Sequence, residues 1–149
     1  MNEIKIKLKK LNKNAKIPTH GSEQAAGYDL YACLESDKLI VPPHGTVKVP
    51  TGISMELPQN TFGAIFARSG IALKKYLRPA NCVAVIDSDY RGEYIVILHN
   101  DSNTPQEIEN FERIAQLVIM PYIPINFCEV EELSKTERGE SRFGSTGNK

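Results

Sequence analysis

Short apolar runs rich in Val and Ile recur along this chain, with glycine or proline between them. Clear examples are residues 62–67, 82–86 and 94–98. β-Branched side chains pack well on a pleated surface, and short strands about 8–12 residues apart are typical of an all-β sandwich or barrel. Residues 69–75 form the one convincing helical turn, with Ser69 as a candidate N-cap. The pattern therefore predicts an all-β fold with one short helix.

The alternation of apolar and polar residues predicts the remaining strands. They are expected at residues 4–8, 25–32, 114–120 and 123–130, and within residues 47–57, where Pro50 and Gly52 break the pattern. After residue 133 the apolar pattern stops, and the chain becomes polar, charged and glycine-rich. We therefore predict a β domain over residues 1–133 and a mobile C-terminal tail over residues 134–149.

The charges of the chain balance, because its 149 residues include 18 Lys and Arg and 18 Asp and Glu. A neutral chain argues against a nucleic-acid or membrane surface built on bulk charge, so an anion site needs a local group of arginines. The first residues lack the continuous apolar run of a signal peptide, and no later segment is long enough to span a bilayer. We expect a soluble intracellular protein.

The three cysteines, Cys33, Cys82 and Cys128, are scattered along the chain. Their odd number and wide spacing fit neither a disulfide framework nor a zinc cluster, so each is expected to be a small buried hydrophobe. The three histidines are also isolated and show no ligand spacing.

Residues 81–98 are predicted to form a β-hairpin, with a polar loop between two β-branched arms. The loop holds Asp87 and Tyr90, and Gly92 is free to adopt a positive φ. A carboxylate at the rim of a rigid hairpin is well placed to act as a general base. Asp and Gly also favour turns, so the alternative interpretation is a solvated acidic turn.

Two further segments suit an anion. Arg68-Ser69-Gly70 lies where a strand meets the helical turn, so an Arg fork, a hydroxyl and backbone N–H groups come together there. Arg113 opens a later strand, and period 2 places it on the face opposite Gln116. For Arg68, the alternative is an arginine whose aliphatic stem lies against a capped turn. For Arg113 and Gln116, the alternative is an edge-strand arginine and a partly buried glutamine.

The tail segment 138–147 combines two arginines, two further hydroxyl residues after Ser141, and several glycines around the single aromatic Phe143. Glycines let backbone N–H groups close around an anion, and an aromatic ring offers a flat face for a base. This favours a lid that orders on a ligand, although a disordered tail is the alternative. Asp29 could contact a metal ion through water, since Mg²⁺ keeps several of its waters, or it is a strand-end carboxylate.

Five segments of the chain, taken together and in order, resemble the motifs of the trimeric deoxyuridine triphosphatase (dUTPase) family. They are residues 25–32, Arg68-Ser69-Gly70, residues 81–93, Arg113-Ile114-Ala115-Gln116 and residues 138–147. The resemblance runs from about residue 20 to the C-terminus. It implies a jelly-roll-like β barrel with one short helix, and a homotrimer whose active sites are shared between chains.

The implied reaction is hydrolysis of dUTP to dUMP and pyrophosphate, with Mg²⁺ on the triphosphate. Such an enzyme keeps uracil out of DNA and supplies dUMP for thymidylate synthesis. It would be cytoplasmic, or nuclear if the source is eukaryotic or viral, and would bind neither nucleic acid nor membrane.

The resemblance also implies roles for individual residues. Asp87 would activate the water that attacks the α-phosphorus, and Asp29 would bind the metal through water. The residues expected to bind substrate are Arg68, Ser69, Gly70, Asn81, Ala84, Tyr90, Gln116, Arg138, Phe143, Gly144, Ser145 and Thr146. Tyr90 would pack under the deoxyribose, and Phe143 would stack on uracil. Arg113 matches its motif, with a phosphate role and a structural role both open.

The chain departs from the family pattern at three places: Ala67 replaces a frequent Pro, Ala84 a usual Gly, and Ser141-Arg142 a common Gly-Gly. Two other functions compete with the hydrolase. A dCTP deaminase of the same fold is disfavoured, because Asp87 and the Phe143 tail follow the hydrolase pattern. A dUTPase-like binding or signalling module is disfavoured by the intact Asp87, Arg68 and tail.

Overall fold

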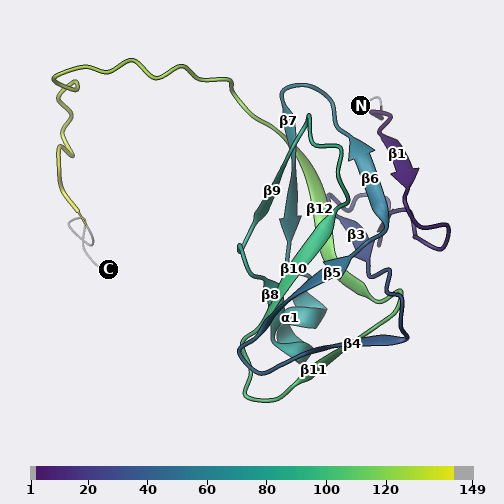
Figure 1. The fold of residues 1–149 in the computed structure, drawn as a ribbon. Helices are drawn as coiled ribbons and strands as arrows, with labels where there is room; N and C mark the ends of the chain where they lie inside the picture. The colour runs from purple at the N-terminus through teal and green to yellow at the C-terminus, as the bar shows by residue number, and fades with distance from the viewer. Residues whose placement is uncertain (1–2, 143–149) are drawn as a thin grey trace.

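The computed structural model describes residues 3–142 of the chain. In these residues the chain forms strands and one short helix, so the predicted all-β class is confirmed (Figure 1). The elements are β1 (Lys7–Lys10), β2 (Thr19–His20), β3 (Tyr28–Tyr31), β4 (Lys38–Val41), β5 (Thr46–Pro50), β6 (Ile53–Glu56), β7 (Thr61–Phe66), α1 (Ser69–Lys75), β8 (Leu77–Pro79), β9 (Ala84–Asp87), β10 (Ile95–Asn100), β11 (Gln106–Glu109) and β12 (Arg113–Pro121).

The strands pair antiparallel in four sheets. The largest has the order β2-β3-β12-β7-β9, and the second has the order β5-β10-β8. Two small sheets, β1-β6 and β11-β4, complete the set among residues 3–142. The hydrogen-bonded ladders of this part of the chain do not close into one barrel. The mostly-β architecture is thus observed, whereas the closed jelly-roll-like barrel stays a prediction.

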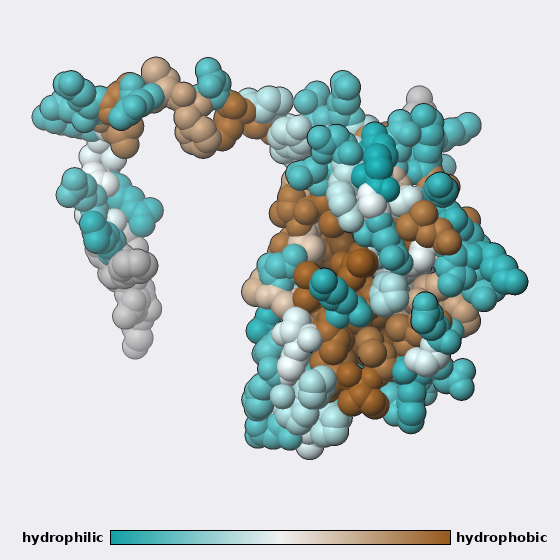
Figure 2. All heavy atoms as spheres, in the orientation of Figure 1, coloured by the Kyte–Doolittle hydropathy of each residue, from teal (hydrophilic) through white to brown (hydrophobic). Residues whose placement is uncertain are grey.

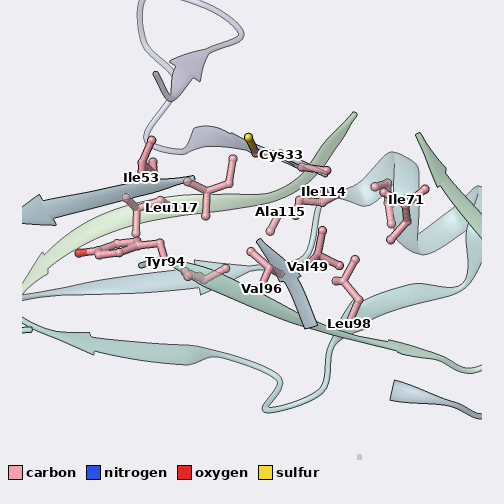
Figure 3. Close-up of a cluster of buried hydrophobic side chains, with 14 of the residues drawn as sticks. Cys33, Val49, Ile53, Ile71, Tyr94, Val96, Leu98, Ile114, Ala115 and Leu117 are labelled. Atoms are coloured by element: carbon pink, nitrogen blue, oxygen red, sulfur yellow. The ribbon is translucent and has the colours of Figure 1, made fainter. Parts of the chain in front are cut away.

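The apolar core lies between the sheets and is built from buried side chains of several strands (Figure 3). Along β10, Val96 and Leu98 point inward and are buried, while Ile95 and Ile97 point outward. Ile65 of β7 and Leu117 of β12 meet them from the large sheet. Burying a side chain of this size contributes about 1.5–3 kcal/mol, so the repeated pattern holds the sheets together.

The predicted hairpin at residues 81–98 is wrong. β9 pairs with β7, whereas β10 pairs with β5 and β8, so the two arms lie in different sheets. Residues 88–94 leave β9 through a turn in which the Tyr90 N–H donates to the Asp87 carbonyl at 3.1 Å. Both arms are apolar, and each pairs with a strand that is distant in the sequence. Apolar alternation marks a strand without choosing its neighbour.

The strand predicted at residues 123–130 is also absent from the structure, because β12 ends at Pro121. Pro121 and Pro124 lack the N–H that a ladder needs. The apolar side chains beyond them face solvent, with Ile123 exposed to 84% and Phe127 to 89%. Figure 1 shows this segment running away from the sheets.

Helix α1 begins as predicted, but its N-cap is Arg68 in an extended conformation, and no side chain caps the first turn. The Ser69 N-cap is therefore wrong, because Ser69 is already inside the helix. The cysteine prediction holds for Cys33, which is buried, and fails for Cys82 and Cys128, which are exposed. Within residues 3–142, no helix combines the length and the apolar character that crossing a membrane requires.

The Tyr94 hydroxyl provides a stability test. The side chain is fully buried, and its hydroxyl has no hydrogen-bond partner among the described protein groups. A buried polar group without a partner costs about 1–3 kcal/mol. Tyr94→Phe is therefore expected to raise the free energy of urea unfolding by about 1 kcal/mol. Tyr122→Phe, at an exposed tyrosine, is the control that should change little.

The same hydroxyl gives a pH dependence. Burial raises the pKa of Tyr94 from 10.0 to about 12. Between these two values the unfolded chain releases the phenol proton and the folded chain keeps it, so the stability that Tyr94 contributes falls as pH rises. This decline should be smaller in Tyr94→Phe across the same alkaline range. An equal decline in both proteins would contradict the assignment.

Candidate active site

Asp87 is the last residue of β9 and opens onto a hollow of about 620 Å³. The hollow is lined by Glu56, Leu57, Pro58, Gln59, Asp87, Ser88, Asp89, Arg91 and Tyr122. The Asp87 side chain is exposed, and pairing of Phe62 with Asp87 fixes its backbone at the edge of the large sheet. A solvent-facing carboxylate on a rigid strand end can accept a proton from water.

The loop after Asp87 is ordered by its own polar groups. The Arg91 guanidinium donates to the carbonyls of Ser88 at 2.7 Å and Tyr90 at 3.1 Å. The Tyr90 hydroxyl donates to the Glu93 carbonyl at 3.1 Å. A Cβ at Gly92 would collide with the Tyr90 hydroxyl, so a larger residue here would displace the Tyr90 ring. Tyr90 is thus held in place within this loop, and its side chain stays 43% exposed, although it does not itself line the hollow.

A second hollow, of about 450 Å³, lies at the junction of β3, β7, α1 and β12. Its charged residues are Asp29, Arg68 and Arg113. Asp29 is buried, and its two carboxylate oxygens accept from Arg68 Nε at 2.7 Å and from the Arg113 guanidinium at 3.2 Å. One carboxylate balances only one of the two cations, so the hollow keeps a net positive charge that suits an anion.

The expectation that Arg113 and Gln116 lie on opposite faces is wrong. The register of β12 against β3 shifts between Arg113 and Ala115, and both Ile114 and Ala115 are buried. This β-bulge breaks the period of 2, so Arg113 and Gln116 line the same hollow. Gln116 donates to the Ala67 carbonyl at 2.9 Å, and its side-chain oxygen fills the space that a Cβ at Gly27 would need.

The other predicted substrate residues are placed less centrally. Ser69 lines the second hollow, and Gly70 follows it in the exposed first turn of α1. Asn81 is exposed in the loop before β9, and Ala84 pairs with Ile65 and packs against the core. Neither Asn81 nor Ala84 lines one of the two hollows.

The tail residues are described only in part. Arg138 is exposed and its carbonyl accepts from the Ser141 N–H at 3.1 Å. Phe143, Gly144, Ser145 and Thr146 lie outside the described residues. The predicted lid is therefore not tested here.

The predicted site residues that line a hollow fall into two groups on this chain. Asp87 lines the first hollow, and Asp29, Arg68, Ser69 and Gln116 line the second. Among residues 3–142, none lines both hollows. A triphosphate that contacts both Asp87 and the arginines must therefore reach both hollows.

The motifs assign no role to Arg91 or Glu93, yet both hold the loop that carries Tyr90. An arginine and a glutamate around a glycine are ordinary in a solvated turn, so the sequence carried no signal for them. The structure also places the Arg113 guanidinium on Asp29, which the sequence left undecided.

The dUTPase family model matches residues 13–147. The chain belongs to the dUTPase family. It is 44% identical over 150 residues to the deoxyuridine 5'-triphosphate nucleotidohydrolase of Desulfitobacterium hafniense (strain DSM 10664 / DCB-2), covering 99% of each chain. Its identity to the enzyme of that name from Oryza sativa subsp. japonica is also 44%, over 95% of this chain and 80% of the relative. The family and the hydrolase class predicted from the motifs are thus confirmed.

The fold agrees with a solved dUTPase structure. A variant of the Staphylococcus bacteriophage 80alpha dUTPase with dUpNHpp superposes with a TM-score of 0.86 and 28% identity, over 96% of this chain and 98% of that one. The mostly-β architecture with its single short helix is therefore that of a dUTPase.

The Asp29 cluster predicts a clear stability difference. Asp29→Asn removes the charge shared by two arginines at a buried position, and losing such charge-assisted bonds costs about 1.5–3 kcal/mol. Asp101→Asn is the matched control, because Asp101 pairs with Arg78 at an exposed position where ion pairs contribute about 0–1 kcal/mol. Urea unfolding measures both, and equal losses would contradict the buried role of Asp29.

Proposed function

We propose that this dUTPase-family protein hydrolyses dUTP to dUMP and pyrophosphate within a jelly-roll-like β barrel over residues 1–133, with residues 134–149 as a closing tail. The observation that carries the proposal is the solvent-facing Asp87 carboxylate at the lip of its hollow. The product dUMP would feed thymidylate synthesis, and removal of dUTP would keep uracil out of DNA. A cytoplasmic location, or a nuclear one in a eukaryotic or viral setting, belongs to the same proposal.

Asp87 acts as the general base. It takes a proton from a water molecule whose oxygen attacks the α-phosphorus, the bond from that phosphorus to the bridging oxygen breaks, and pyrophosphate leaves. Phosphoryl transfer asks mainly for position and charge stabilisation, so one base and a set of cations are sufficient chemistry. The exposure of Asp87 supports this role, because water reaches the carboxylate.

The arginine hollow binds the phosphates. Arg68, Ser69, Gly70 and Gln116 provide a cation, a hydroxyl and amide groups at one place, and Arg113 adds a second cation. In a chain with no net charge, this local excess supplies the attraction for a triphosphate. Arg138 and the tail residues Phe143, Gly144, Ser145 and Thr146 would close over the bound nucleotide.

The base and the sugar are recognised near β9. Asn81 and the backbone around Ala84 read the uracil edge, and Tyr90 packs under the deoxyribose. The half-exposed, fixed ring of Tyr90 supports this role, since a rigid wall leaves little room for a ribose 2′-hydroxyl.

Mg²⁺ is the expected cofactor, and the residues present fit a loosely held ion. Residues 3–142 contain no group of three His, Cys, Asp or Glu side chains that could hold a metal by themselves. Each Asp29 oxygen already accepts from an arginine and keeps a lone pair for a water molecule. Asp29 would therefore bind the ion through water, and the ion when bound supplies charge neutralisation on the triphosphate.

A homotrimer with shared active sites would join the two hollows. The Asp87 hollow of one chain would face the arginine hollow of another. Exposed apolar side chains support such association. Beside and on β9 these are Val83, exposed to 39%, and Val85, exposed to 61%. On β10 they are Ile95, exposed to 38%, and Ile97, exposed to 36%. Figure 2 shows apolar side chains gathered over this part of the molecule. The exposed apolar segment after Pro121 adds a second surface for a neighbouring chain.

Asp87→Asn is expected to lower the release of pyrophosphate from dUTP by about 10³-fold, while binding of a non-hydrolysable dUTP analogue stays within about threefold. The base is lost and the pocket is kept. Calorimetry and a pyrophosphate assay measure the two effects, with Asp101→Asn as the control. Turnover near that of the unmodified protein would remove Asp87 from its role.

The same assays separate the alternatives. Ammonia released from dCTP would indicate a deaminase. Tight binding of dUTP without release of pyrophosphate would indicate a binding module.

Shared sites predict complementation between inactive variants. Asp87→Asn and Arg68→Ala, each nearly inactive alone, should regain about a quarter of full activity when co-expressed at equal levels, because random assembly restores both residues in that share of sites. Light scattering checks the trimer. If both residues of one site come from one chain, the mixture stays inactive.

A further inference from the structure

The loop that carries Tyr90 is fixed to a distant turn of the chain. Residues 88–94 join β9 to β10 and form no strand of their own. At their end, the Glu93 carboxylate accepts from the Gly52 N–H at 2.8 Å, in the turn between β5 and β6. The Tyr94 N–H donates to the Ile53 carbonyl at 2.9 Å, and the Thr51 hydroxyl donates to the Tyr94 carbonyl. The loop is therefore anchored on a separate part of the fold.

The anchoring turn is itself rigid. Gly52 has a φ of +69°, and a Cβ there would lie 2.9 Å from the Ala15 Cβ and 3.0 Å from Cys33 Sγ. Its carbonyl accepts from the Leu11 N–H at 2.7 Å. The Gly52 N–H consequently points in a fixed direction, and the half-buried Glu93 side chain is bound to a fixed donor.

Glu93 in turn sets the position of Tyr90. The Glu93 carbonyl accepts the Tyr90 hydroxyl, and Gly92 leaves just enough space for that hydroxyl. A shift of the Glu93 backbone would therefore move the tyrosine ring. The contacts run from Gly52 to Glu93 and from Glu93 to Tyr90, and they involve none of the proposed phosphate ligands.

We propose that Glu93 is a positioning residue for substrate selection: its carboxylate, bound to Gly52, holds the Tyr90 ring against the sugar and thereby sets the preference for dUTP over UTP. This rests on the proposed function, in which Tyr90 packs under the deoxyribose. Glu93 touches no reacting atom in this role. Loss of its carboxylate loosens the wall that excludes a 2′-hydroxyl and leaves Asp87 in place at the end of β9.

The test compares kcat/KM for dUTP and UTP. Glu93→Ala is expected to lower the dUTP/UTP ratio about tenfold, because a misplaced wall discriminates less well. Glu93→Gln keeps an oxygen that accepts from Gly52 N–H and should stay within about twofold of the unmodified ratio. Glu93→Asp, which is too short to reach Gly52 without movement, serves if Glu93→Ala does not fold, and its ratio should also fall.

Glu112→Ala is the matched control. Glu112 accepts from the Glu109 N–H at 2.9 Å and pairs with Lys75, and it lines neither predicted site hollow. It should lower the thermal midpoint and leave the dUTP/UTP ratio unchanged. If Glu93→Ala behaves in the same way, or if Glu93→Gln loses selectivity as strongly as Glu93→Ala, the inference is overturned. An unmodified protein that releases no pyrophosphate from dUTP would overturn the proposed function and this inference with it.

Discussion

The pairing of β12 along both of its edges is the constraint on which the candidate site depends. β3 occupies one edge and β7 the other, so Asp29 on β3, Arg68 just after β7, and Gln116 on β12 come together although they are far apart in the sequence. The bulge near Arg113 adds a second arginine to the same place. A regular ladder would have turned that side chain to the other face.

This arrangement buries Asp29, so its negative charge must be balanced by neighbouring protein groups. A carboxylate removed from water is stable when cations and hydrogen bonds satisfy it, and Arg68 and Arg113 provide both. The same contacts hold the two arginine side chains in one geometry. An anion that bound there would therefore lose little free energy to ordering these side chains. The cluster contributes to stability, and in the proposed function it would also pre-organise the phosphate site.

The large sheet carries both parts of the proposed site, with the arginine hollow near β3 and β12 and Asp87 at the end of the edge strand β9. Each part opens onto its own hollow, so under the proposed trimer a single chain would present two incomplete surfaces. The apolar residues left exposed on β9 and β10 occur in the same region as Asp87. Association of chains would cover these residues and complete the chemistry in one step.

The sequence by itself determined many of the strand segments, where the one helix lies, and which side chains are available for chemistry, because apolar period and motif are local properties. Only the tertiary structure decided that the arms around Asp87 belong to different sheets, that Arg113 and Gln116 share a hollow, and that Cys82 is exposed. These outcomes depend on which distant strand forms the more favourable hydrogen-bonded ladder and buries more apolar surface. That choice is a property of the whole chain, and no window of the sequence contains it.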